Sequence, residues 1–293
     1  MTVQKILIAT DFTEQADLAL GHAMTLARHT GASLSIIHAL GRSNNDADTT
    51  AFEGTETFQK RVQELQMAAR TQLEDLRERN LGQGVELSHV FVDRMPEQGI
   101  AMVAAESNAD LIVVGSHGRN RISSFFLGSV SRRVVKTAKC DVMVARGTPP
   151  TSGYKRILVP TDFSEQSERA ILRAGQIVAK GGTVEIFHCW QMPTGPISYW
   201  GNDVGPSLQT GLREMVQERG KACLGKHMRS DVEFLFSDQM GPPRFLIEDR
   251  AKHGNFDLVV AGTHGRGGLD RLLLGSVAES LVSHLSISAY LVR

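Results

Sequence analysis

The sequence predicts an α/β protein made of two tandem, Rossmann-like domains, each built on a five-stranded parallel sheet. The chain repeats itself, since KILIATDFTEQADLAL at residues 5–20 returns as RILVPTDFSEQSERAI at residues 156–171. Short apolar runs alternate with stretches of helical period in each half, which is typical of a parallel sheet covered on both faces. The 293 residues are enough for two domains, because one domain usually takes about 100–200 residues.

The other repeated segments define the boundary between the halves. The offset falls from 151 residues at Asp11 and Asp162 to 147 near the end of each half. We therefore expect one domain at residues 1–147 and another at 154–293, joined by a linker at 148–153 of exposed composition. The repeated pairs are SLSIIHA (33–39) and TVEIFHC (183–189), ADLIVVGSHGR (109–119) and FDLVVAGTHGR (256–266), and LGSVSRRVV (127–135) and LGSVAESLV (274–282).

The elements follow from the hydrophobic period and from end signals. Thr13 is a candidate N-cap for the first helix, Gly31 a candidate end, and Pro96 opens a later helix. In an open sheet of this kind, ligands bind beyond the carboxyl ends of the strands, where the strand order reverses. The expected strands are 5–10, 33–39, 85–92, 110–115 and 141–145 in the first half and 156–161, 183–189, 231–236, 257–262 and 287–292 in the second; the other first-half helices are 56–81, 96–107 and 127–138.

Composition excludes several classes of protein. Lys plus Arg equals Asp plus Glu at 32 each, so there is no basic surplus for nucleic acid and no polybasic segment for a membrane. No apolar run approaches the roughly 20 residues of a membrane-spanning helix. The amino terminus reaches Asp11 too early for a secretory signal. Three widely spaced cysteines without a CxxC pattern favour free thiols in a reducing cytoplasm.

A glycine pattern follows the fourth strand of each half. G-x-x-G is separated by nine residues from G-S in both copies. Glycine has no Cβ, so its backbone amides can approach an anion closely, and the second glycine precedes a helix whose positive end favours phosphate. One such loop is equally well explained by turns and a cap, but two copies with the same spacer favour a phosphate site.

An acidic residue ends the first strand of each half, at the expected crevice. Asp11 and Asp162 are suited to a ribose hydroxyl, an adenine amine or a metal, although a turn or N-cap role is the plainer alternative. His38 and His188, which end the second strands, are expected to be packed or capping residues. His117 and His264 have no second ligand at regular spacing, so no metal site is assigned. Walker and kinase motifs are absent, so we assign no catalytic residue and expect at most slow hydrolysis.

The segment GTHGRGGLDRLLLGSVAESLV at residues 262–282 resembles the ATP-binding branch of the universal stress protein family. The resemblance covers both halves. It implies the adenine nucleotide alpha hydrolase-like fold with strand order 3-2-1-4-5, ATP with or without Mg²⁺ at the strand ends, and pairing through the last strand within the chain or in a homodimer. It implies nucleotide contacts at Asp162, Cys189, Gly262, Gly265, Arg266, Gly275, Ser276 and Val277, and in the first half at Asp11, Ala39, Gly115, Gly118, Arg119, Gly128, Ser129 and Val130.

The two glycine loops differ in their spacers. The first, RNRISSFFL, carries Phe125 and Phe126 where the second, RGGLDRLLL, has no aromatic residue. We therefore prefer the second site. Three functions stay open: a stress-response protein that uses ATP as a regulatory ligand, a scaffold that binds no nucleotide, and a slow ATPase.

Overall fold

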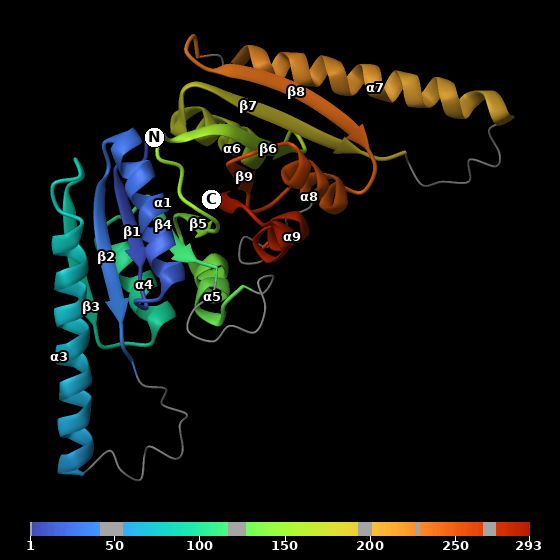
Figure 1. The fold of residues 1–293 in the computed structure, drawn as a ribbon. Helices are drawn as coiled ribbons and strands as arrows, with labels where there is room; N and C mark the ends of the chain where they lie inside the picture. The colour runs from blue at the N-terminus through green and yellow to red at the C-terminus, as the bar shows by residue number, and fades with distance from the viewer. Residues whose placement is uncertain (1, 42–54, 117–126, 193–200, 227–228, 266–273) are drawn as a thin grey trace. The chain divides into compact units, whose positions relative to one another are not determined.

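The computed structural model describes residues 2–41, 55–116, 127–192, 201–226, 229–265 and 274–293 (Figure 1). Contacts divide the chain into two compact units, Met1–Thr151 and Ser152–Arg293. Within the described residues, no helix is both long and apolar enough to cross a membrane.

The first unit is a parallel sheet with helices packed on it (Figure 1). Its strands lie in the order β3-β2-β1-β4-β5, as predicted. Helix α1 begins where Thr13 accepts a hydrogen bond from the Ala16 amide and ends at Gly31, whose φ of 73° is left-handed. The elements are β1 (Lys5–Ala9), α1 (Glu14–Thr30), β2 (Ser33–Ala39), α3 (Glu56–Arg79), β3 (Leu87–Val92), α4 (Pro96–Glu106), β4 (Leu111–Gly115), α5 (Ser129–Thr137) and β5 (Asp141–Ala145).

The second unit repeats this topology with strand order β8-β7-β6-β9-β10, again parallel throughout. The predicted fold class is therefore confirmed. Strand β7 is longer than expected, because pairing continues back to Val178 at the end of α6. The elements are β6 (Tyr154–Thr161), α6 (Glu165–Ile177), β7 (Val178–Trp190), α7 (Gly201–Lys226), β8 (Glu233–Met240), α8 (Pro243–His253), β9 (Leu258–Gly262), α9 (Ser276–His284) and β10 (Ser288–Val292).

The central strands carry the core of each unit and locate the crevice. Residues 111–114 and 258–261 are buried along their whole length, as expected for parallel strands covered on both faces. Strand β1 pairs with both β2 and β4, and β6 with both β7 and β9. The chain order reverses at these two strands, so their carboxyl ends are the topological switch points.

The segment after β5 packs back onto α1 of the first unit. His22 Nε2 donates to the Gly147 carbonyl at 3.1 Å, and Thr25 Oγ1 donates to the Pro150 carbonyl at 3.0 Å. Gly21 permits close packing here, because a Cβ at this position would lie 2.6 Å from Cγ of Pro149. Pro149 and Pro150, which the sequence assigns to the linker, thus contact the first unit.

His22 is expected to make the first unit sensitive to acid. Burial lowers the pKa of His22 from its ordinary value of 6.5. The unfolded chain therefore binds this proton at higher pH than the folded chain. The contribution of neutral His22 to the free energy of unfolding is present above about pH 6.5 and decreases as the pH falls below that value. In His22→Gln, which retains a donor for Gly147, the decline between pH 6.5 and 5 should be smaller. Urea unfolding at several pH values measures this; an unchanged pH dependence would contradict it.

Candidate functional site

The same turn follows the first strand of each unit. Phe12 and Phe163 adopt left-handed backbone conformations, with φ of 62° and 59°. Such values are unfavourable for a bulky residue and are typically retained where the surroundings require them. The preceding Thr10 and Thr161 stabilise the turn, since each hydroxyl accepts the phenylalanine amide at 3.0 Å. The turn fixes the aspartate between the threonine and the phenylalanine.

The aspartates take part in this turn with one carboxylate oxygen. Asp162 Oδ1 accepts from the Ser164 amide at 3.0 Å, and Asp11 Oδ1 accepts from the Thr13 amide at 3.2 Å. The turn role considered from the sequence is therefore present. The other oxygen of Asp162 faces the glycine loop, because a Cβ at Gly265 would lie 2.7 Å from Oδ2. One oxygen of Asp162 thus stabilises the turn, while the other lies at the cavity beside Gly265.

A histidine at the end of the second strand supports each turn from the side. His38 Nδ1 and His188 Nδ1 donate to the carbonyls of Thr10 and Thr161 at 2.8 and 2.7 Å. Since a carbonyl only accepts, these ring nitrogens carry the proton. The rings pack on Phe12 and Phe163 with centroids 4.4 and 4.5 Å apart. Both histidines are packing residues, as the sequence analysis expected.

The two ends of the glycine loop meet at the helix start. The Gly275 amide donates to the Thr263 carbonyl at 2.8 Å, and Gly128 does the same to Ser116 in the first unit. Gly275 and Gly128 are the N-caps of α9 and α5. A glycine N-cap offers no side chain to the first amides of its helix, so these donors remain suited to an anion. Gly118, Arg119, Phe125, Phe126 and Arg266 lie outside the described residues.

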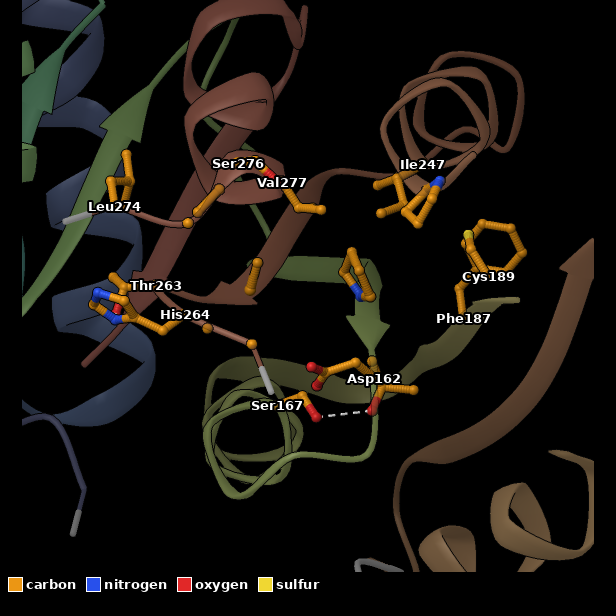
Figure 2. A pocket seen from close by; sticks show the side chains of 18 residues that line it. Asp162, Ser167, Phe187, Cys189, Ile247, Thr263, His264, Leu274, Ser276 and Val277 are labelled. Carbon is orange, nitrogen blue, oxygen red and sulfur yellow. Dashed lines mark hydrogen bonds between the residues drawn. The ribbon is translucent and has the colours of Figure 1, made fainter. Parts of the chain in front are cut away.

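In the second unit these segments enclose a cavity of about 610 Å³ (Figure 2). This is within the roughly 300–1,000 Å³ typical of small-molecule sites. Seven of the eight residues expected from the sequence line it: Asp162, Cys189, Gly262, Gly265, Gly275, Ser276 and Val277. In Figure 2 Asp162 lies below the centre, Ser276 and Val277 start the helix above, and Cys189 lies to the right.

The corresponding cavity of the first unit is smaller, at about 160 Å³. The expected residues Asp11, Ala39, Gly115, Gly128, Ser129 and Val130 all line it. One difference lies at the third residue of the helix. Ser131 lines the first cavity and donates to the Gly115 carbonyl at 2.6 Å, whereas the second cavity has Ala278 there. The first cavity lies below the volume range of small-molecule sites.

The apolar wall of the second cavity was not identified from the sequence. It is formed by Phe187 on β7 and by Pro243 and Ile247 on α8. Figure 2 shows Phe187 and Ile247 on the same side as Cys189. Pro96 and Ile100 take the equivalent places in the first cavity. The repeated proline at the start of the third helix of each half, α4 and α8, was therefore a usable signal, since one face of that helix reaches the crevice in both halves.

Comparison with known proteins agrees with this architecture. The profile of the universal stress protein family matches twice, at residues 2–146 and 153–293. The chain belongs to the universal stress protein family.

Similar proteins occur in bacteria and archaea. A universal stress protein of Mycobacterium tuberculosis is 30% identical over 207 residues, which cover 66% of this chain and 64% of that relative's length. A putative universal stress protein of Staphylococcus aureus is 30% identical over 176 residues, covering 59% of this chain and 96% of the relative. The crystal structure of a universal stress protein from Archaeoglobus fulgidus has a TM-score of 0.65 and 18% identity, covers 99% of this chain and 98% of that one, and shows the shared fold.

The residues of this universal stress protein cavity fit an adenine nucleotide. The apolar wall would contact the base, Asp162 would bind the ribose, and the glycine loop and the start of α9 would bind the phosphates. His264 Nε2 is buried beside the loop without a hydrogen-bond partner among the described residues. No group of three His, Cys, Asp or Glu side chains in the described ranges is placed to hold a metal ion.

The thiol of Cys189 is expected to be unreactive. Burial raises the pKa of Cys189 from 9.0 to about 12. Because only the thiolate is alkylated, its reaction with iodoacetamide at pH 8 should be roughly 1,000-fold slower than that of an ordinary thiol. Mass spectrometry of the peptide containing Cys189 measures the rate, with the urea-unfolded chain as control. Labelling at equal rates in folded and unfolded protein would contradict the expectation.

Proposed function

We propose that this protein binds an adenine nucleotide, with ATP as the first candidate, in the cavity of its second half, and that the nucleotide is a regulatory ligand. The observation that carries the proposal is the convergence of Asp162, the glycines of the loop and Ser276 on one cavity of about 610 Å³. These residues come from the ends of β6 and β9 and from the start of α9.

The chemistry of the cavity favours a phosphorylated ligand. Helix α9 has nine residues and presents the amides of its first turn with the hydroxyl of Ser276. Such a helix start attracts negative charge through its dipole and its unsatisfied donors. Gly265 has no side chain where the loop passes Asp162. Phosphate at α9 and the base against Phe187 and Ile247 would place the ribose beside Asp162.

Regulation is favoured over catalysis. Among the described lining residues, Asp162 is the only carboxylate, and its Oδ1 already accepts the Ser164 amide. Rapid phosphoryl transfer requires an oriented nucleophile together with several positioned charges. The described part of the cavity offers donors for phosphate rather than such a set. We therefore expect binding without turnover on the time scale of binding and release.

The first half is proposed as the weaker site. Its cavity of about 160 Å³ holds the same kinds of residues in a smaller space. We expect one nucleotide per chain, held by the second half.

Isothermal titration calorimetry with ATP and Mg²⁺ tests the proposal. We expect one site per chain, with weaker binding of cAMP because it lacks the polyphosphate. Asp162→Asn should weaken ATP binding at least tenfold, since the charged carboxylate is lost while an acceptor for Ser164 remains. Asp11→Asn is the matched control and should leave the affinity unchanged. No binding of any adenine nucleotide at millimolar concentration would refute the proposal and leave the scaffold function, while phosphate release that Asp162→Asn abolishes would indicate the slow ATPase.

A further inference from the structure

Gln166 lies behind the second cavity, outside its lining. It is the second residue of α6, two residues after the N-cap Ser164. Its side chain and backbone press against the end of β9. A Cβ at Gly262 would lie 2.8 Å from Gln166 Cγ and 3.2 Å from its carbonyl carbon and oxygen. Gly262 is therefore required for the approach of α6, which is a different reason from the phosphate contact expected from the sequence.

The carboxamide of Gln166 joins the ends of two strands. Nε2 donates to the Val292 carbonyl at the end of β10 at 3.0 Å, and lies 3.5 Å from Oγ1 of Thr263. The Thr263 amide donates to the same Val292 carbonyl at 3.1 Å, and the Thr263 carbonyl accepts from Gly275 at 2.8 Å. Thr263 is 1% exposed. Gln166 thus fixes the residue that connects β9 to the N-cap of α9.

The first unit stabilises the same place in another way. Gln15 is the repeat counterpart of Gln166, and within the described residues its carboxamide makes no equivalent hydrogen bond to β5. There the end of β4 is held by Ser131, whose hydroxyl donates to the Gly115 carbonyl and whose side chain lines the cavity. In the second unit Ala278 replaces that serine. In the second unit the end of β9 is therefore held by Gln166 from outside the cavity, and the position that Ser131 has in the first cavity wall is an alanine.

We propose that Gln166 is the positioning residue of the second site. Its carboxamide N–H holds Thr263, and through Thr263 the Gly275 N-cap, in the arrangement that presents the first amides of α9 to a ligand. The glutamine acts without contacting the ligand, and it does so from outside the cavity, so no space for the ligand is lost. The ligand named here rests on the proposed nucleotide function; the positioning itself concerns the ligand-free protein.

The test uses the full chain with Gln166→Met and Gln166→Glu. Methionine keeps the chain length against Gly262 without a donor, and glutamate keeps the size and shape of the side chain without a donor. In ligand-free protein, both should increase hydrogen exchange of the Gly275 amide about tenfold, the effect of losing one supporting hydrogen bond. Both should weaken ATP binding about tenfold in calorimetry. Gln15→Met is the matched control and should change neither quantity.

Each result decides the proposal. Unchanged exchange at Gly275 in both variants overturns it. Faster exchange with wild-type ATP affinity also overturns it, because a purely structural role would give that pattern. If methionine weakens binding and glutamate does not, size rather than the N–H is responsible and the proposal is again wrong. If the wild-type chain binds no nucleotide, the proposed function fails, whereas the exchange measurement still decides whether Gln166 positions the loop.

Discussion

Gly275→Asp should abolish ATP binding by the second half, with a loss of affinity of at least about 100-fold. Gly275 is the N-cap of α9, with φ −62° and ψ 151°, a conformation that aspartate adopts readily at this position. Its carboxylate would accept the first amides of the helix and place a negative charge where phosphate is expected to bind. Calorimetry with ATP and Mg²⁺ measures the loss.

The same substitution is expected to leave the second unit folded. Aspartate is among the favoured N-cap residues, so it stabilises a helix start. The new Cβ would lie 3.0 Å from the Thr263 carbonyl oxygen, a tight contact that requires a small shift. A melting temperature within a few degrees of wild type is therefore expected. Gly128→Asp makes the same change at the first-unit N-cap and should leave ATP affinity unchanged; equal losses from both substitutions would contradict a single competent site.

Glu185→Ala should destabilise the second unit by about 2–3 kcal/mol. Glu185 lies on β7 and is 4% exposed. Its Oε1 accepts from Arg250 Nε at 2.9 Å, from Arg250 Nη2 at 2.7 Å and from Ser237 Oγ at 2.5 Å. Removing one partner of a buried ion pair leaves the other partner poorly compensated. The Arg250 side chain is 44% exposed, so water offsets part of the loss and the expected value lies below that of a fully buried pair.

The repeat provides a matched control for this prediction. Ser35 occupies the place of Glu185 in the first unit, and its hydroxyl is 2.8 Å from that of Ser88. Ser35→Ala removes one neutral hydrogen bond and should cost about 1 kcal/mol or less. Urea unfolding followed by circular dichroism compares the two variants. Equal effects of Glu185→Ala and Ser35→Ala would show that the ion pair adds no stability beyond an ordinary hydrogen bond.

Much of the fold was readable because its causes are local. The β-branched runs before Gly115 and Gly262 form the buried central strands, and Thr13 and Gly31 bound α1 as expected. The parallel topology followed from the alternation of strands and helices. Because parallel strands end on the same edge of a sheet, the residues after the first and fourth strands were expected to meet, and the described ones do line one cavity in each unit.

The sequence by itself determined that the chain is a duplication, that each half is a parallel α/β sheet, and which residue types meet at the strand ends. These properties depend on hydrophobic period, on turn residues and on repeated motifs, all of which can be recognised along the chain without knowing which segments are in contact. Only the tertiary structure decided that the second cavity is the larger one and that Gln166 supports it. Cavity volume depends on packing between distant segments, and Gln166 lies 97 residues before Thr263, a contact that no local pattern specifies.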